Sequence, residues 1–297
     1  MTISVGLIPN GETVMLIQDA EVSYRRVGFT QDIYKKIKDI DSSSVTGVIG
    51  YPFIANEIIE LTKESQYRSG RELSDKVEQA YHTVRIKHLF RGVLAKYGFT
   101  DVKEVIAPHQ GVNINPHVVE EVLELTNNQN DFFSLDLMLA TNYDKPLLYL
   151  VSFPGSSVLY NNIKDYTVSG SGTIMAVEKM GVELENYRWQ SELSLDEGID
   201  ILMKAGKASE KHAGVGGPFE IVYISRQEKE VRVTRPDQKK INMIIYIMDL
   251  GIKENIMSEA IKQMRKSEIS AEQLADYIKT NTRVGIEFDQ YFGLNND

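Results

Sequence analysis

The chain has 297 residues, of which 42% are hydrophobic and 25% are charged, and it contains no cysteine. The lack of cysteine excludes disulfides, thiol nucleophiles and thiolate metal sites. The formal net charge of −9 disfavours nucleic-acid binding, which normally uses a basic surface.

The sequence has neither the start of a secretory protein nor an apolar run long enough for a membrane span. The start lacks the basic and apolar segments of a secretory signal, and the apolar run at 241–252 is too short to cross a bilayer and contains Asp249. The five histidines show no metal-ligand spacing. We therefore expect a cytoplasmic protein that has no nucleic-acid or membrane partner and needs no metal or other cofactor.

The first predicted elements are two strands joined by a tight turn. Ile3, Val5 and Leu7 alternate with smaller residues, which is the period of a strand with one buried face. Asn10-Gly11 is a turn signal, and the apolar run at 13–21 predicts a returning strand buried between two layers.

The remaining elements are predicted in blocks of strands and blocks of helices, which favours an α+β architecture over a repeated βαβ unit. Strands are expected at 33–50, 132–142, 146–153, 157–172 and 218–225, and helices at 53–65, from about 71, at 173–180, at 194–212 and over most of 237–297. Capping boxes mark two helix starts, at Ser194 with Glu197 and at Ser270 with Gln273.

The order and spacing of several segments resemble a proteasome β-type subunit of the N-terminal-nucleophile hydrolase superfamily. The matching segments are "TISVGLI", "LIQDAE", "YKKIKDID", "GVIGYPFIANEIIEL", "YTVSGSGTIMAVEKM" and "LSLDEGIDILMKAGKASEKHAGVGGPFEIVYI". The resemblance implies a four-layer αββα sandwich over residues 2–236, a helical insertion at 98–130, and a helical C-terminal extension at 237–297.

The resemblance also assigns roles to five residues. Thr2 matches the nucleophile, which becomes the first residue once Met1 is removed and then carries its own base, because an α-amine titrates near pKa ~8. Lys36 matches the active-site lysine and Asp19 the acid that holds it. Gly50 matches the backbone oxyanion donor, and Ser171 the serine that orients the α-amine.

Two positions depart from the family pattern. Where active β-type subunits have an aspartate and a further polar residue after the late helix, this chain has His212 and Val215. Valine cannot form a side-chain hydrogen bond, so part of the surrounding polar shell is missing. His212 is either a replacement titratable group or a sign that the site is weakened.

Three functions therefore stay open. The first is a threonine peptidase or amidase that acts on a peptide or protein through an acyl-enzyme. The second is a peptide ligase or transpeptidase resembling connectase, a monomeric proteasome homologue with a C-terminal extension. The third is a catalytically silent proteasome-like scaffold subunit. A homo-oligomer is possible, but the apolar stripes at 241–248 and 274–278 must be buried, and we do not expect a standard four-ring barrel.

Overall fold

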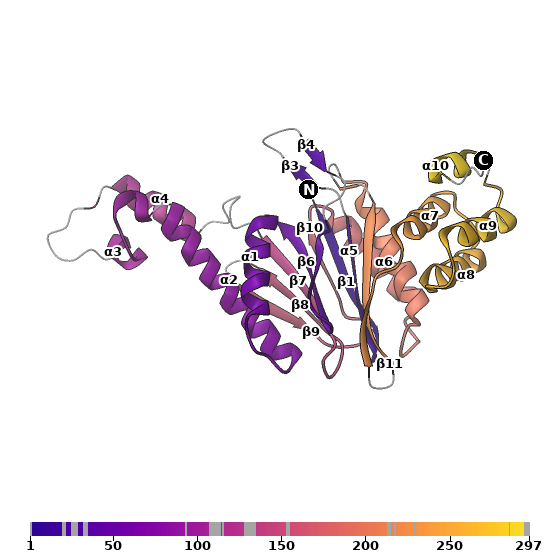
Figure 1. The fold of residues 1–297 in the computed structure, drawn as a ribbon, viewed down its shortest axis with the longest axis horizontal. Helices are drawn as coiled ribbons and strands as arrows, with labels where there is room; N and C mark the ends of the chain where they lie inside the picture. The colour runs from indigo at the N-terminus through magenta and orange to yellow at the C-terminus, as the bar shows by residue number, and fades with distance from the viewer. Residues whose placement is uncertain are drawn as a thin grey trace.

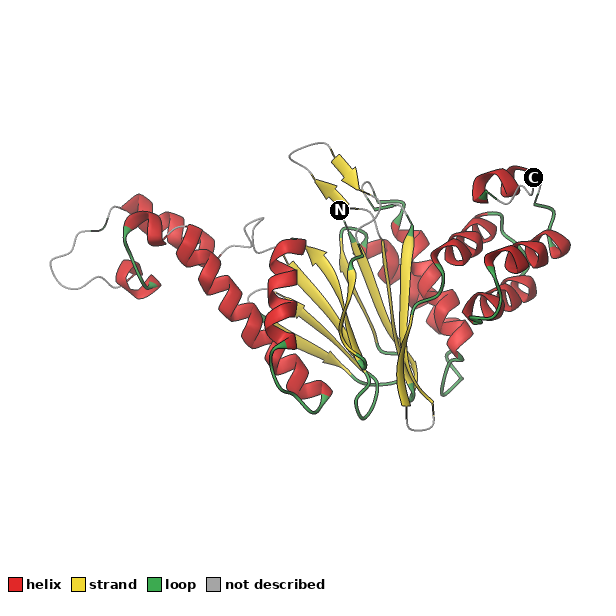
Figure 2. Cartoon of the chain, viewed as in Figure 1, coloured by secondary structure: helices red, strands yellow, loops and turns green. Residues whose placement is uncertain are grey.

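The computed structural model shows a mixed α/β protein in which strands form the centre and helices cover both sides (Figures 1 and 2). It describes residues 2–293 apart from the following: 20–21, 25–28, 32–34, 93, 107–113, 115, 128–134, 153–154, 213–214, 217, 228–229 and 285. Met1 lies outside the described residues, so its predicted removal stays a prediction.

The first sheet contains the N-terminal strand at an inner position. Its order is β10-β1-β2-β11-β12, and each neighbouring pair is antiparallel. The strands are β1 (Ile3–Asn10), β2 (Thr13–Asp19), β10 (Tyr166–Gly170), β11 (Phe219–Gln227) and β12 (Glu230–Thr234). Since β1 lies between β2 and β10, the position of Thr2 is fixed from two sides.

The second sheet is also antiparallel and has the order β5-β6-β7-β8-β9. Its strands are β5 (Ile37–Asp41), β6 (Ser44–Gly50), β7 (Leu135–Thr141), β8 (Leu147–Ser152) and β9 (Ser156–Tyr160). A short hairpin of β3 (Val22–Tyr24) and β4 (Phe29–Gln31) stands apart from both sheets (Figure 1). Strand β5 is an edge strand, which leaves one row of its backbone groups to be satisfied by other elements.

The two sheets bury apolar side chains against each other. Val14, Leu16 and Val222 from the first sheet share one fully buried cluster with Met138 and Leu148 from the second. The alternate side chains of the same strands face outwards, as the period of two in a strand requires. Each sheet therefore has a second buried face that needs helices to cover it.

Helices cover these outer faces. On the second sheet, α1 (Pro52–Lys63) and α2 (Gly70–Gly92) bury Ile58, Leu73 and Val84 against β7 and β8. On the first sheet, α5 (Thr173–Asn186) and α6 (Leu195–Ser209) bury residues such as Met180 and Leu202. The capping box of Ser194 and Glu197 forms as predicted.

The C-terminal helices join the same core as α6. They are α7 (Gln238–Asp249), α8 (Glu254–Arg265), α9 (Ala271–Asn281) and α10 (Ile286–Phe292). The apolar stripe residues Ile244, Leu274 and Ile278 are fully buried in the cluster that also contains Ile3 and Leu202. The stripes therefore pack against their own chain, and the predicted capping box at Ser270 and Gln273 is confirmed.

A small helical unit lies at the far end of α2 (Figure 1). It consists of the 3₁₀ helix η1 (Leu94–Tyr97), α3 (Val102–Ile106) and α4 (Pro116–Asn127). Its own buried cluster contains Leu94, Val105, Val118 and Val122. Helix α4 contacts α3 and α2, and its Glu121 accepts a hydrogen bond from the Tyr97 hydroxyl of η1.

Several elements differ from the sequence prediction. The β3–β4 hairpin and strand β12 were not predicted, because the hairpin strands have three residues each and β12 has only two apolar residues in a polar run. Within the described part of the chain, every helix is too short or too polar to span a bilayer.

Candidate functional site

Both polar groups of the peptide bond between Thr2 and Ile3 are held by hydrogen bonds. The N–H of Ile3 donates to Asp19 Oδ1 at 2.8 Å, and the carbonyl of Thr2 accepts from the N–H of Ser171 at 2.8 Å. Gly170, with φ of +116°, comes so close that a Cβ there would lie 2.0 Å from the Thr2 oxygen. Only glycine fits this position without moving Thr2.

Asp19 is the last residue of β2, and its side chain is fully buried. Burial raises the pKa of its carboxyl group from 3.8 to about 6, although the positive charge of Lys36 and the hydrogen bond from Ile3 act in the opposite direction. Both carboxylate oxygens have partners, because Oδ1 accepts from Ile3 and Oδ2 lies 3.2 Å from Lys36 Nζ. The geometry therefore suits a charged carboxylate that orients a cation.

Lys36 connects the acid to the hydroxyl. Its Nζ lies 3.2 Å from Asp19 Oδ2 and 3.0 Å from Thr2 Oγ1, and the residue is only 4% exposed. The neighbouring Lys35 side chain is 48% exposed and pairs with Asp39. The family resemblance selected Lys36 of these two adjacent lysines, and Lys36 is the one that lies beside Thr2.

Gly50 ends β6 with φ of +113°, a conformation that favours glycine. The N–H of Val48, two residues earlier, donates to the carbonyl of Lys36 at 3.2 Å. Gly50 therefore lies on the strand that pairs with the segment of Lys36, and it is exposed. Helix α1 begins immediately beyond it, at Pro52.

His212 and Val215 lie in the turn that follows α6. His212 is exposed, and its backbone hydrogen bonds are with Ser209 and Val215. Among the described contacts, none joins His212 to Thr2, Asp19 or Lys36. Val215 is buried in the core beside the first sheet, so its apolar side chain has a packing role there.

The cluster of Thr2, Lys36 and Asp19 has the geometry of an activated hydroxyl. An ammonium group 3.0 Å from a hydroxyl oxygen stabilises the alkoxide and lowers the cost of removing its proton. The buried carboxylate keeps the ammonium in this position. Thr2 is half-buried, and its two charged partners are shielded from water.

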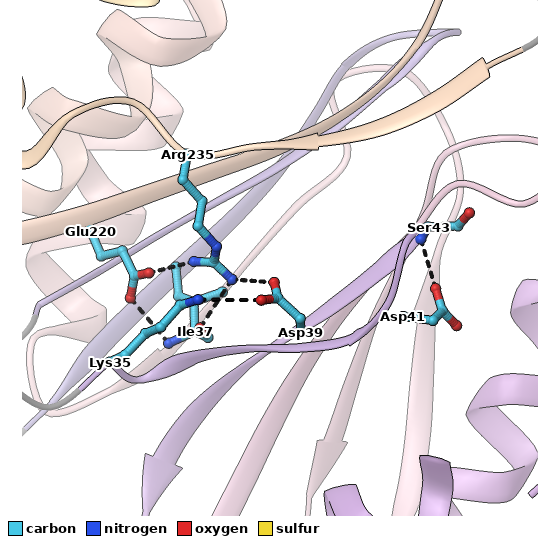
Figure 3. Close-up of polar contacts among 7 residues, drawn as sticks. All are labelled: Lys35, Ile37, Asp39, Asp41, Ser43, Glu220 and Arg235. Carbon is cyan, nitrogen blue, oxygen red and sulfur yellow. Dashed lines mark hydrogen bonds and ion pairs between the residues drawn. The ribbon is translucent and has the colours of Figure 1, made fainter. Parts of the chain in front are cut away.

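Sequence reasoning missed a second set of polar residues beside Lys36. Glu220 on β11 and Arg235 after β12 form an ion pair, and both contact the backbone of Ile37 (Figure 3). Arg235 also pairs with Asp39. These residues are 183 and 198 positions away from Ile37, so no local pattern in the sequence could have related them to it.

A pocket of about 490 Å³ lies beside β5 and α1, but Thr2 does not line it. Two of its lysines are neutralised by acids, since Lys35 pairs with Asp39 and Lys63 with Glu60. The pocket therefore has no concentration of unpaired charge, and the chemistry favours the cluster around Thr2 as the candidate site.

Among the described residues, no group of three or more histidine or acidic side chains is arranged to hold a metal ion. No family model and no curated protein matches this chain.

Proposed function

We propose that this chain is an N-terminal-nucleophile hydrolase with the αββα sandwich of proteasome β-type subunits, and that Thr2 forms an acyl-enzyme with a peptide or other amide. The observation that carries the proposal is the position of Lys36 Nζ, 3.0 Å from Thr2 Oγ1 and 3.2 Å from Asp19 Oδ2. Two sheets and the face-to-face packing between them also support it.

The proposed reaction begins at the Thr2 hydroxyl. After removal of Met1, the free α-amine of Thr2 takes the hydroxyl proton, and Oγ1 attacks the carbonyl carbon of the substrate. Lys36 stabilises the developing negative charge on Oγ1. The N–H of Gly50 stabilises the oxyanion of the tetrahedral intermediate. When the intermediate collapses, the C–N bond breaks, the proton passes to the leaving amine, and an ester to Thr2 remains.

The ester has two possible fates. Attack by water releases a carboxylic acid and completes hydrolysis. Attack by a second amine forms a new amide and makes the protein a ligase, similar to connectase. The second fate is favoured by the way α7–α9 pack on the core of their own chain, because a covered outer face suits a protein that acts outside the standard ring.

The first experiment measures the intact mass of the protein purified from its native cells. We expect a mass that lacks one methionine, because the mechanism needs the free α-amine of Thr2. Retention of Met1 in all molecules would remove the proposed base and contradict the mechanism.

The second experiment uses 4-nitrophenyl acetate as an acyl donor and locates the acetyl group by mass spectrometry. We expect acetylation at Thr2, a loss of activity in Thr2→Ala, and normal activity in Thr280→Ala, which removes an exposed hydroxyl bonded within its own helix. A Thr2→Ala protein that releases nitrophenol at the wild-type rate would exclude Thr2 as the nucleophile. A folded wild-type protein without acyl-enzyme would favour the silent scaffold.

Lys36→Ala is expected to reduce acylation about 100-fold or more, whereas Lys35→Ala removes the exposed neighbour and should have little effect. Loss of Lys36 leaves a buried carboxylate without this cation, at a cost of about 3–5 kcal/mol of unfolding free energy. Circular dichroism must therefore show that the variant is folded. Adding an amine-bearing peptide to the acyl-enzyme then separates ligation from hydrolysis.

A further inference from the structure

The polar backbone groups of Ile37, the residue that follows Lys36, are both held by side chains from elsewhere in the chain. Its N–H donates to Glu220 Oε2 at 3.2 Å, and its carbonyl accepts from Arg235 Nη2 at 3.2 Å. Ile37 lies opposite Gly47, and the hydrogen bond to β6 is made by the preceding residue, Lys36. In an antiparallel pair the groups of Ile37 therefore point away from β6, towards the open edge of the sheet.

Glu220 and Arg235 belong to the sheet that carries the nucleophile. Glu220 lies opposite Gln18 on β2, one position from Asp19. Arg235 directly follows β12, the last strand of that sheet. The pair therefore joins the sheet of Thr2 and Asp19 to the edge strand that follows Lys36 (Figure 3).

The pair is well placed to resist movement. The side chains of Glu220 and Arg235 are 15% and 23% exposed, and the guanidinium contacts Glu220, Asp39 and the carbonyl of Ile37 at once. A guanidinium has a planar set of donors, so three simultaneous contacts fix both its position and its orientation.

The C-terminal extension fixes the backbone on the far side of Arg235. Gln238, the first residue of α7, donates through Nε2 to the carbonyl of Phe219 at 2.7 Å, and Phe219 lies opposite Asp19. Arg235 is thus held between a strand that ends at Thr234 and a helix anchored beside Asp19.

We propose that Glu220 and Arg235 are positioning residues that set the distance between Lys36 and Thr2, by holding the strand after Lys36 against the sheet of the nucleophile. This inference rests on the proposed function of Thr2. The competing explanation is that the pair only caps the exposed edge of β5, and the two explanations predict different behaviour of Lys36.

The test compares Arg235→Gln and Glu220→Gln with the matched control Arg265→Gln. Arg265 on α8 pairs with Asp196 on α6 and is 28% exposed, so the control also breaks an ion pair between a C-terminal segment and the sandwich. Thermal melting gives the structural cost of each change. The acylation rate with 4-nitrophenyl acetate and the reactivity of the Lys36 amine towards acetic anhydride give the functional cost, with the exposed Lys103 as reference.

We expect Arg235→Gln and Glu220→Gln to lower kcat by about 10- to 100-fold with little change in KM, since small displacements of catalytic groups have effects of this size. Acetylation of Lys36 should become faster relative to Lys103. Arg265→Gln should lower the melting temperature to a similar extent and leave both kcat and Lys36 labelling at wild-type values. Arg235→Lys keeps one charged contact and should recover part of the rate.

Wild-type kcat and Lys36 labelling in Arg235→Gln and Glu220→Gln, together with a lowered melting temperature, would overturn the proposal and leave only an edge cap. The labelling experiment does not need an active enzyme. Failure of this inference is thus distinct from failure of the proposed function, which is decided by whether Thr2→Ala abolishes acylation.

Discussion

The two helical regions outside the two sheets and their covering helices are attached in opposite ways. The described residues of the unit at 94–127 pack around their own small cluster, and η1 and α4 contact α2. The C-terminal helices instead share one continuous core with α6 and the first sheet. The two regions use similar amphipathic helices but differ in what covers the apolar faces. In the unit at 94–127 these faces are buried against each other, whereas in the C-terminal region they are buried against α6 and the first sheet.

This difference has a physical consequence for stability. Removing a region with a separate core leaves the remaining core covered, whereas removing a region that shares the core exposes it. We therefore expect the unit at 94–127 to behave as an accessory and the C-terminal helices to be required for the folded domain. The following experiments test this comparison.

The largest effect is expected from deleting residues 237–297. The deletion uncovers the apolar side chains on α6 and the first sheet that Ile244, Leu274 and Ile278 cover. We expect an aggregating protein without a cooperative unfolding transition, as checked by size-exclusion chromatography and circular dichroism. Replacing 98–130 by a flexible Gly/Ser linker is the control, and it should leave a folded protein. A soluble, active truncation at residue 236 would reverse this view of the C-terminal region.

A pair of identical substitutions compares the two regions at single-residue scale. Leu274 in α9 is fully buried in the shared core, and Leu94 is 3% exposed in the separate cluster. We expect Leu274→Ala to lower the global free energy of unfolding by about 2–5 kcal/mol, measured by urea denaturation. Leu94→Ala should leave the main transition in place, because its cluster opens locally. Equal losses in both variants would mean that the two regions unfold together.

The next effect concerns pH and the buried acid. The pKa of Asp19 is raised to about 6, so below this pH the carboxylate is protonated and no longer holds the Lys36 ammonium. The α-amine of Thr2 must also be neutral, with a pKa near ~8. A plot of log acylation rate against pH should have slope one below about pH 8 and slope two below about pH 6.

Variants distinguish the two ionisations. Asp19→Asn should be slower and keep a slope of one at every pH below about 8, while Leu94→Ala should keep the full wild-type profile because its unit is remote from the site. The raised pKa of Asp19 by itself favours the folded state at low pH, where the group is protonated, and this contribution is lost as pH rises through about 6. A circular dichroism spectrum that stays constant between pH 5 and 8 is therefore the control for folding.

A slope of two in the pH–rate plot of Asp19→Asn would contradict this assignment, because the lower step would then belong to another group.

The smallest effect is expected for exposed ion pairs. Lys96 lies 3.6 Å from Glu121 in the outer unit, and Lys239 lies 3.5 Å from Glu272 in the C-terminal region. Both pairs are largely exposed, and such pairs contribute little to stability. Lys96→Ala and Lys239→Ala should both leave the melting temperature unchanged. A clear decrease in only one of them would mean that surface charge, besides apolar burial, distinguishes the regions.

The sequence predicted well those features of the fold that depend on interactions between neighbouring residues. The turn between β1 and β2 and the capping boxes at Ser194 and Ser270 depend on residues within a few positions of each other. Resemblance to a family placed Thr2, Asp19, Lys36 and Ser171 together, and the distances between them agree with that grouping. Their catalytic roles stay predictions.

What the sequence could not provide is long-range pairing. Nothing near Lys36 indicates that Glu220 and Arg235 contact the next residue, because the contact arises only when β11 and β12 come to lie beside β5. The same limit applies to the way the C-terminal stripes are buried. Periodicity predicted that Ile244 and Leu274 would be covered, but not that the covering surface would be their own sandwich.

The inner position of β1 has a consequence for the order of events during synthesis. Strand β1 is made well before its neighbour β10, which begins only at Tyr166, and the residues that hold Ile37 follow at Glu220 and Arg235. Contacts between such distant positions form late. If Thr2 acts as we propose, the nascent chain carries an unassembled nucleophile until these later segments have been made. The protein then gains its reactivity only after the C-terminal helices that share the core with Ile3 have been made, which protects the emerging chain from its own chemistry.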